Sequence, residues 1–251
     1  MVDPDIIDKS KIVNFEAPIP EDSIGVSEAA LKMEYPYLGH RDYTHGSSMI
    51  EGMLKSIHMA HPYNNSSIAE IRQFRIIQQF ASHSTAESMK TENANKHPRL
   101  GEALARLDML INDEKYTSLL FSSNIPINWR LSEYNAADYI LDVNCINGEE
   151  SFGRLQNVSD FVDLIRGVNE INRQLTVNSF LKESWSQRVR WAYIKKFPFL
   201  SDEEAVKVVK VSFGRPKIVD LKKHRFEIKE GALEGKGMKH VFQICFFIEL
   251  P

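Results

Sequence analysis

The spacing of apolar residues changes near residue 115, from a mainly helical period to the alternation typical of strands. Before that point, one apolar stripe predicts a helix from about Ser47 to Met59, with Ser47 or Ser48 as its N-cap. Two more helices are predicted on either side of a polar loop at 82–98. These helices span Ser66–Phe80 and Leu100–Ile111. One early strand is predicted at Ile12–Glu16.

After residue 115 the pattern predicts a meander, two helices and a closing meander. Asn147-Gly148 is the strongest hairpin signal of the chain. Ser201 followed by Glu204 is typical of a capping box at the start of a helix. One helix is predicted to begin near Asn157 or Ser159, and the other to span Lys182–Lys196. The predicted strands are Thr117–Phe121, Ile125–Leu131, Asp138–Ile146, Val206–Phe213, His224–Lys229 and His240–Leu250.

A helix followed by antiparallel strands thus occurs twice along the chain. We therefore predict an α+β fold made of two helix-plus-antiparallel-meander halves. The first half covers residues 1–147 and carries a helical insertion at about 66–115, and the second half covers residues 148–251. No strong residue identity relates the halves, so the repeat is predicted from the order of the elements.

The composition is that of an ordinary soluble globular protein, with 251 residues, 43% of them hydrophobic and 26% charged. The formal net charge of −3 and a pI near 6.3 argue against a general nucleic-acid binder. No apolar run reaches the roughly 18 residues that span a bilayer, and the first residues do not form a secretory signal. We expect a cytoplasmic protein with no nucleic-acid or membrane partner, in which Cys145 and Cys245 are free thiols.

Candidate chemistry gathers just before and inside the first predicted helix. His40 follows an aromatic, proline-containing approach, and Glu51 comes shortly afterwards in an apolar helix. Histidine exchanges a proton near neutral pH, and burial makes a carboxylate hold its proton more tightly. Such a pair could remove one proton and deliver another, as acid–base catalysis requires. The plainer alternative is a turn histidine and a solvated glutamate.

Two short motifs resemble the hotdog-fold superfamily. Gly39-His40 followed by Met49-x-Glu51-Gly52-Met53 is similar to the stretch of beta-hydroxyacyl thioester dehydratases in which a Gly-His pair precedes the central helix. The run Val211–Pro216, with Asp220 and Phe226–Ile228 after it, looks like the strand, Arg-Pro turn and second strand of that family. The second half lacks a Gly-His pair before its helix, which fits a double hotdog with one working and one degenerate half.

This resemblance implies an enzyme of acyl thioesters that needs no cofactor. The central helix would direct the backbone N–H groups of Gly46, Ser47 and Ser48 at the thioester carbonyl. His40 would take the proton next to that carbonyl, and Glu51 would protonate the departing hydroxyl. Dehydration of a beta-hydroxyacyl thioester is the most concrete reaction, and hydrolysis or condensation is possible on the same scaffold. The sheets would pair within one chain or in a homodimer.

A basic, tryptophan-containing segment offers a second type of contact. Arg188, Arg190 and Lys195 could bind the phosphates of coenzyme A or the acidic face of an acyl carrier protein. The alternative function is a non-catalytic binding module that docks an acidic partner through this helix. The structural alternative is a surface helix without a binding role, whose tryptophans pack inward and whose cations face water.

Four histidines between residues 40 and 61 suggest a third possibility. His58 and His61 have the spacing that places two imidazoles on one helix face, with Glu51 as a third potential ligand for zinc or iron. No familiar metal-binding signature is matched, and we expect no metal.

Overall fold

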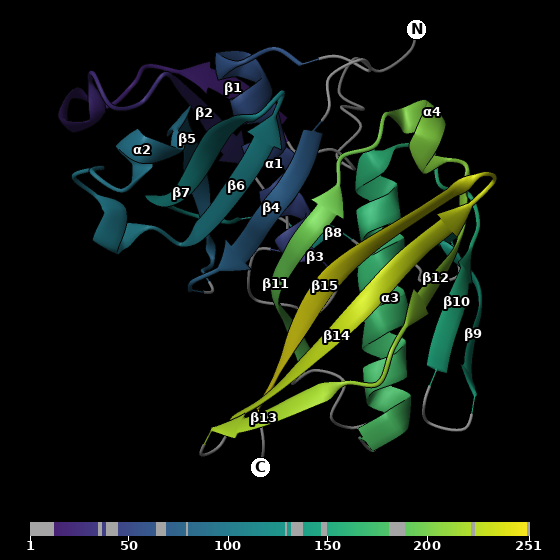
Figure 1. Cartoon of the computed structure of the whole chain (residues 1–251). Helices are drawn as coiled ribbons and strands as arrows, with labels where there is room; N and C mark the ends of the chain where they lie inside the picture. The colour runs from purple at the N-terminus through teal and green to yellow at the C-terminus, as the bar shows by residue number, and fades with distance from the viewer. Residues whose placement is uncertain are drawn as a thin grey trace, which may run out of the picture. The chain divides into compact units, whose positions relative to one another are not determined.

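The computed structural model describes residues 13–34, 37–38, 45–63, 69–78, 80–128, 130–131, 138–146, 150–180, 189–221 and 224–249. The chain divides into two compact units (Figure 1). Unit 1 comprises Met1–Tyr63, Ile77–Leu107 and Lys115–Tyr134, and unit 2 comprises Asn64–Ile76, Asp108–Glu114 and Asn135–Pro251. In the described part of the chain, no helix is long and apolar enough to cross a membrane.

Unit 1 is built on antiparallel strands in the order β1-β2-β5-β7-β6. Strand β6 follows β5 along the chain but is not its neighbour in the sheet, because β7 lies between them. Two short strands, β3 and β8, pair in parallel. The strands are β1 (Val13–Ala17), β2 (Ala29–Glu34), β3 (Tyr37–Leu38), β5 (Ser82–Lys90), β6 (Ala105–Ile111), β7 (Glu114–Pro126) and β8 (Arg130–Leu131).

Helix α1 (Gly46–Ala60) packs against β2 and β5. Its apolar stripe is fully buried, as the helical spacing predicts, and it comprises Met49, Ile50, Met53, Leu54 and Ile57. Gly52 permits a close approach to β2, because a Cβ atom there would lie 1.6 Å from Met33 Sδ. Two hydrogen bonds fix the helix to β5: Ser56 Oγ donates to the Ala86 carbonyl at 3.1 Å, and Ser88 Oγ donates to Ser56 Oγ at 2.8 Å.

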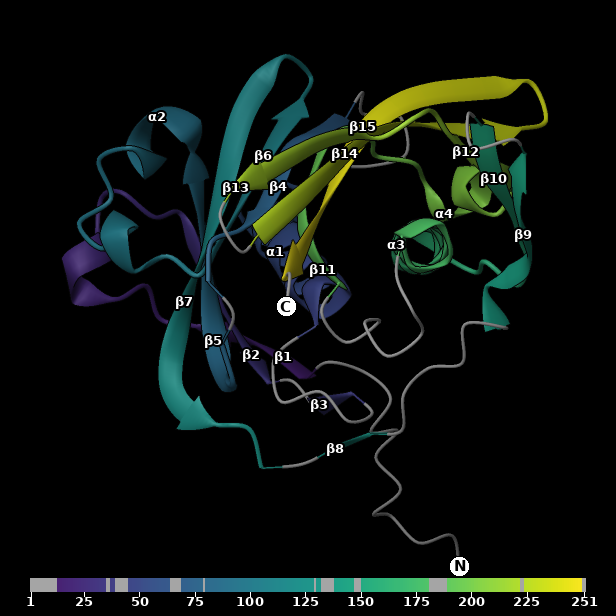
Figure 2. The ribbon, with the colours of Figure 1, turned by 90° about the horizontal axis from the view of Figure 1, so that it is seen from below.

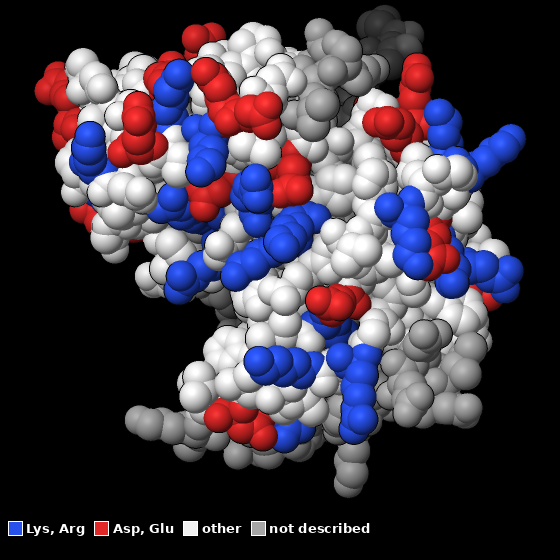
Figure 3. All heavy atoms as spheres, viewed as in Figure 1, with Lys and Arg blue, Asp and Glu red and all other residues white. Residues whose placement is uncertain are grey.

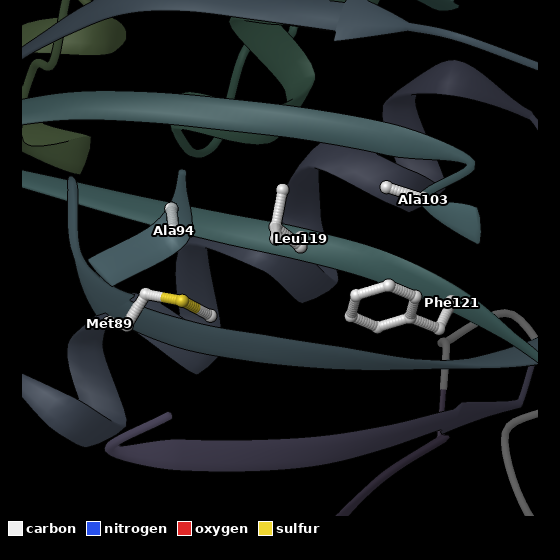
Figure 4. Packing of buried hydrophobic residues seen from close by; sticks show 5 residues of the cluster. All are labelled: Met89, Ala94, Ala103, Leu119 and Phe121. Carbon is white, nitrogen blue, oxygen red and sulfur yellow. The ribbon is translucent and has the colours of Figure 1, made fainter. Parts of the chain in front are cut away.

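The other face of the unit 1 sheet is covered by the segment between β5 and β6. Since side chains alternate along a strand, Glu87 and Met89 point away from the face where Ser88 meets α1. This segment contains α2 (Thr91–Ala94) and the 3-10 turn η2 (Leu100–Glu102). An apolar cluster packs there, as Figure 4 shows, formed by Met89, Ala94, Ala103, Leu119 and Phe121.

Unit 2 has antiparallel strands in the order β9-β10-β12-β14-β15-β11-β4, and β13 pairs with the first part of β14. Its sheet curves around α3 (Phe161–Phe180), which is seen end-on in Figure 2 and contacts β9, β10, β11 and β12. The strands are β4 (Ala69–Ile76), β9 (Ile140–Ile146), β10 (Glu150–Leu155), β11 (Val189–Pro198), β12 (Val208–Phe213), β13 (Lys217–Leu221), β14 (His224–Gly235) and β15 (Met238–Glu249).

Local signals explain the start of both helices of unit 2. At the start of α3, Asp160 Oδ1 accepts from the Asp163 N–H at 2.7 Å, so Asp160 caps the helix and the predicted caps Asn157 and Ser159 are wrong. The predicted capping box of α4 (Asp202–Ala205) is confirmed, with both Ser201–Glu204 bonds present.

Two predicted helices of the first half are wrong, and so is the loop between them. Residues 69–76 form β4, residues 105–111 form β6, and the polar stretch 82–90 forms β5. In β6 the buried residues recur at every second position, from Ala105 to Ile111, and this alternation competes with the helical spacing that we inferred there. In β5 the polar residues Ser84, Glu87 and Ser88 are buried and not solvated. The predicted helical insertion at 66–115 is therefore a set of strands with one short helix.

The described part of the predicted basic helix Lys182–Lys196 is a strand, β11, and residues 181–188 lie outside the described ones. Trp191 and Ile194 are buried. Because β11 pairs with β4 on one edge and with β15 on the other, the segment is a strand despite its helix-like charge spacing. The strands predicted from Val206 onward are confirmed, and β14 continues to Gly235 into the predicted linker. The predicted division at residue 147 stays a prediction.

Candidate active site at the start of helix α1

The first turn of α1 is buried although it is polar. His45 is the N-cap residue with extended backbone, and its carbonyl accepts from the N–H groups of Ser48 and Met49 at 3.0 and 3.1 Å. The N–H groups of Gly46 and Ser47 come at the helix start and have no acceptor within the helix. Ser47 is fully buried, and Ser48 is 5% exposed. A buried helix start of this kind presents N–H donors and a positive dipole end to an oxygen atom.

His45, which the sequence suggested only as a metal ligand, takes part in this turn. Its side chain is 6% exposed, and its Nδ1 atom shares a hydrogen bond of 2.7 Å with Ser47 Oγ. The predicted N-cap at Ser47 or Ser48 is therefore wrong, since the observed N-cap, His45, lies two or three residues earlier. His45 makes no side-chain capping bond, so none of the usual N-cap signals marks this position in the sequence.

Glu51 lies one turn after Ser47 on the same side of α1. Its side chain is 16% exposed, and one carboxylate oxygen accepts from Lys55 Nζ at 2.8 Å. The lysine is half-exposed, so this ion pair lies at the edge of the buried turn. An ion pair of this kind requires the ionised form of the glutamate.

The other predicted site residues fall into two groups. His40 and Arg188 lie outside the described residues. Arg190 and Lys195 belong to β11 in unit 2, where Lys195 Nζ lies 4.8 Å from the ring centroid of Tyr193. On the face shown in Figure 3, acidic and basic side chains are interspersed. Four of the predicted site residues thus lie together on α1, namely Gly46, Ser47, Ser48 and Glu51. Arg190 and Lys195 lie on β11.

The histidines at the end of α1 have other partners. His61 Nε2 lies 2.5 Å from Glu28 Oε2, and its ring stacks on Tyr116 with the centroids 3.8 Å apart. His58 Nδ1 accepts from the Tyr63 N–H at 3.3 Å. Among the residues that the structure describes, no three His, Cys, Asp or Glu side chains gather as metal ligands would.

A buried carboxylate on the other face of unit 1 escaped the sequence reasoning. Glu87 Oε2 accepts from Ser27 Oγ at 2.9 Å and lies 3.1 Å from His97 Nε2. Because His97 Nδ1 accepts from the Arg99 N–H at 3.2 Å, Nε2 is the ring nitrogen that donates, and it points at Glu87. Arg99 Nη1 lies 3.5 Å from the other carboxylate oxygen. This network fastens the segment between β5 and β6 to the sheet.

A second buried carboxylate lies in unit 2, between β14 and α3. Glu227 is fully buried, and Lys229 on the same face of β14 is 4% exposed. Lys229 Nζ donates to Thr176 Oγ1 at 2.8 Å and to Asn172 Oδ1 at 3.0 Å, and it lies 3.4 Å from Glu227 Oε2. Thr176 Oγ1 in turn donates to Glu227 Oε2 at 2.9 Å. The sequence placed Glu227 in a strand, with no sign that it points into the core.

The opposite face of β15 carries a free thiol. Cys245 is buried, and burial raises the pKa of this thiol to about 12. It pairs across the strands with Tyr193, whose pKa burial also raises to about 12. The predicted free state of Cys245 is confirmed, and the Cys145 side chain lies outside the described ones.

The second family-like motif contains the predicted strand, turn and later strand, and an additional strand, β13, lies between the turn and β14. Val211–Phe213 closes β12, and Phe226–Ile228 lies in β14. Asp220 in β13 accepts from Arg225 at 2.7 and 2.9 Å, and this bond lowers the pKa of the aspartate. Asp220 therefore closes the β13–β14 hairpin by an ion pair.

Searches of protein-family models and of curated proteins give no match to the chain. Among solved structures, the chain is similar to a variant of the PpsC dehydratase domain from Mycobacterium tuberculosis, with 8% identity, a TM-score of 0.50 and coverage of 94% of this chain and 97% of that one. It is similar to an isomerase-inactive variant of the GphF DH1 dehydratase, with 10% identity, a TM-score of 0.50 and coverage of 94% and 95%. The chain has the fold of these dehydratase domains. The predicted resemblance to the hotdog superfamily is confirmed as a likeness of fold.

Proposed function

We propose that this protein processes acyl thioesters at the start of α1, and that its two units are the halves of a double hotdog. The observation that carries the proposal is the buried N-terminal turn of α1, which presents the Gly46 and Ser47 N–H groups beside a buried histidine. A thioester carbonyl gains negative charge when the proton next to it is removed, and donors fixed at a helix start stabilise that charge. The fold shared with dehydratase domains supports the same site.

The reaction that we propose is dehydration of a beta-hydroxyacyl thioester. His40 takes the proton from the carbon next to the carbonyl, and the electron pair forms the double bond. The bond from the beta carbon to its oxygen breaks, and Glu51 gives this oxygen a proton, so that water leaves. A proton that returns from the imidazolium to the carboxylate restores both groups. Hydrolysis or condensation at the same turn is the alternative outcome for the thioester.

The ion pair between Glu51 and Lys55 sets a condition on this mechanism. Glu51 can donate a proton only as the neutral acid, whereas Lys55 favours the carboxylate. We propose that the acyl chain separates the pair when it binds. Lys55→Gln should then raise the rate at neutral pH and leave folding stability within about 0.5 kcal/mol, because half-exposed ion pairs contribute little.

We propose a cytoplasmic protein whose substrate is carried on coenzyme A or on an acyl carrier protein. Arg188, Arg190 and Lys195 are the proposed contacts to phosphate groups, since arginine and lysine bind phosphate by charge-assisted hydrogen bonds. The described Lys195 ammonium lies 4.8 Å from the ring centroid of Tyr193.

The test is turnover of beta-hydroxyacyl pantetheine thioesters, followed by the ultraviolet absorbance of the enoyl product. We expect His40→Ala and Glu51→Gln each to lower kcat/KM by at least about a hundredfold, as for loss of a general acid or base. His58→Ala is the matched control, because this exposed histidine lies on the same helix. Unchanged turnover in His40→Ala would refute the proposed base. Release of free pantetheine thiol without enoyl product would replace dehydration by hydrolysis.

A further inference from the structure

The start of α1 has no side-chain cap. His45 occupies the N-cap position, yet its side chain makes no hydrogen bond to the backbone of the first turn. Serine, threonine, asparagine and aspartate are the usual residues there, because their side-chain oxygen accepts one of the N–H groups that the helix leaves over. Among the described helices α1 to α4, only α1 also lacks an acidic residue in its first turn. The stabilisation that a cap supplies is therefore absent from α1.

The start of α3, the other long helix, is closed by the protein itself. The Phe161 N–H donates to Asp202 Oδ1 at 3.0 Å, and the Asp163 N–H donates to Asp160 Oδ1 at 2.7 Å. Two carboxylates thus lie at the positive end of this helix, as the helix dipole favours. A ligand oxygen would have to displace one of these carboxylates to reach the two donors.

In α1 the corresponding donors are buried and remain unused. Gly46, Ser47 and Ser48 are all buried. The Ser48 N–H donates to the His45 carbonyl at 3.0 Å, whereas the N–H groups of Gly46 and Ser47 find no acceptor among the residues that the structure describes. Buried backbone N–H groups without a partner are rare in folded proteins. Contact with solvent therefore does not account for the missing cap of α1.

The imidazole of His45 holds the first turn of α1 without closing it. Its Nδ1 atom shares a hydrogen bond of 2.7 Å with the Ser47 hydroxyl group, so the ring binds a side chain of the turn and not its backbone. A serine or asparagine at position 45 would instead accept a backbone N–H group. The Ser47 N–H is the donor open to such a cap, because the Ser48 N–H already donates to the His45 carbonyl. The imidazole therefore fixes Ser47 and leaves its N–H group to another oxygen atom.

We propose that His45 is a positioning residue, which keeps the Gly46 and Ser47 N–H groups available to the thioester oxygen of the substrate. This inference rests on the proposed function. Negative charge gathers on that oxygen when the neighbouring proton is removed, and donors that are fixed in advance stabilise the charge. A side-chain cap at position 45 would satisfy one of these donors before the substrate binds. A capped α1 would therefore be more stable and less active.

The test replaces His45 by two side chains that differ in one oxygen atom. His45→Ser supplies a cap and His45→Ala does not, and both remove the imidazole. We expect His45→Ser to unfold about 2–4 °C above His45→Ala in thermal unfolding. Its kcat for beta-hydroxyacyl pantetheine thioesters should nevertheless be about tenfold to a hundredfold below that of His45→Ala, because the serine hydroxyl takes one donor. KM should differ by less than about threefold, since the charge develops only in the transition state.

The kcat of His45→Ala should itself lie below that of the wild type, because Ser47 is no longer held. The pair His45→Asn and His45→Leu repeats the comparison with a larger capping side chain and an apolar one of similar volume, should the smaller side chains prevent folding. His58→Ser is the matched control, because this exposed histidine lies on the same helix and its substitution should leave kcat unchanged.

The order of the variants decides the outcome. If His45 has only a structural role, the more stable variant of each pair is at least as active as the other, and that order would overturn the inference. Full wild-type kcat in His45→Ala would overturn it as well. A wild-type protein that turns over no acyl thioester would instead refute the proposed function.

Discussion

The two buried glutamates show two uses of a charge inside a protein. Glu87 in unit 1 bonds Ser27 and His97 through Oε2 and has Arg99 Nη1 3.5 Å from Oε1, so two of its partners come from the chain segment between β5 and β6. Glu227 in unit 2 has partners on one oxygen only, from α3 and its own strand. The first network fastens a surface segment to the sheet. The second connects helix α3 to β14, and the charge of its glutamate is balanced by a buried lysine.

Removal of one partner of the Glu227–Lys229 pair should have the largest effect on stability. Lys229→Met leaves a buried carboxylate without its counter-charge, and we expect a loss of about 3–5 kcal/mol in the free energy of unfolding. Urea unfolding measures this loss. In the double variant Glu227→Leu/Lys229→Met, most of the stability should return. A double variant as unstable as the single one would make this pair structural, and the contrast with Glu87 would disappear.

Loss of the Glu87 carboxylate should lower the free energy of unfolding by a smaller amount. Glu87→Ala leaves the His97 and Ser27 donors buried without an acceptor, which should cost about 2–3 kcal/mol in urea unfolding. Glu102→Ala is the control, because this exposed glutamate also pairs with Arg99 and should cost under about 0.5 kcal/mol. Equal costs for both variants would show that the network does not fasten the segment.

A smaller, pH-dependent effect should come from unit 1. Burial lowers the pKa of His83 on β5 below its ordinary value of 6.5. The unfolded chain therefore binds a proton at this residue that the folded chain excludes, and stability falls as the pH falls below about 6.5. Unfolding midpoints between pH 5 and 8 should depend less on pH in His83→Gln than in the exposed control His58→Gln. Identical pH dependence would contradict this role of His83.

The sequence predicted elements where one physical signal dominated. The stripe of α1, the capping box of α4 and the closing strands are present because period, cap and turn residues agree there. The first-half strands were missed because their polar residues, such as Glu87 and Ser88, bond to groups far away along the chain. For the candidate site, the helix could be predicted from its apolar stripe, whereas its N-cap at His45 could not. The buried position of Glu227 could not, because only tertiary pairing decides which face of β14 is covered.

The long β14–β15 hairpin has a consequence for refolding. Its strands pair in register from Gly235–Met238 to His224–Glu249 around a tight turn, where Gly237 has a φ of 78°. Hairpins of this kind close within microseconds, whereas β5 pairs with β7 only after the intervening residues 91–113 fold back. A refolding chain therefore forms the ladder while the charges of Glu227 and Lys229 are still hydrated. These charges lose their water only when α3 docks, so that docking is the step at which the pair has to be desolvated.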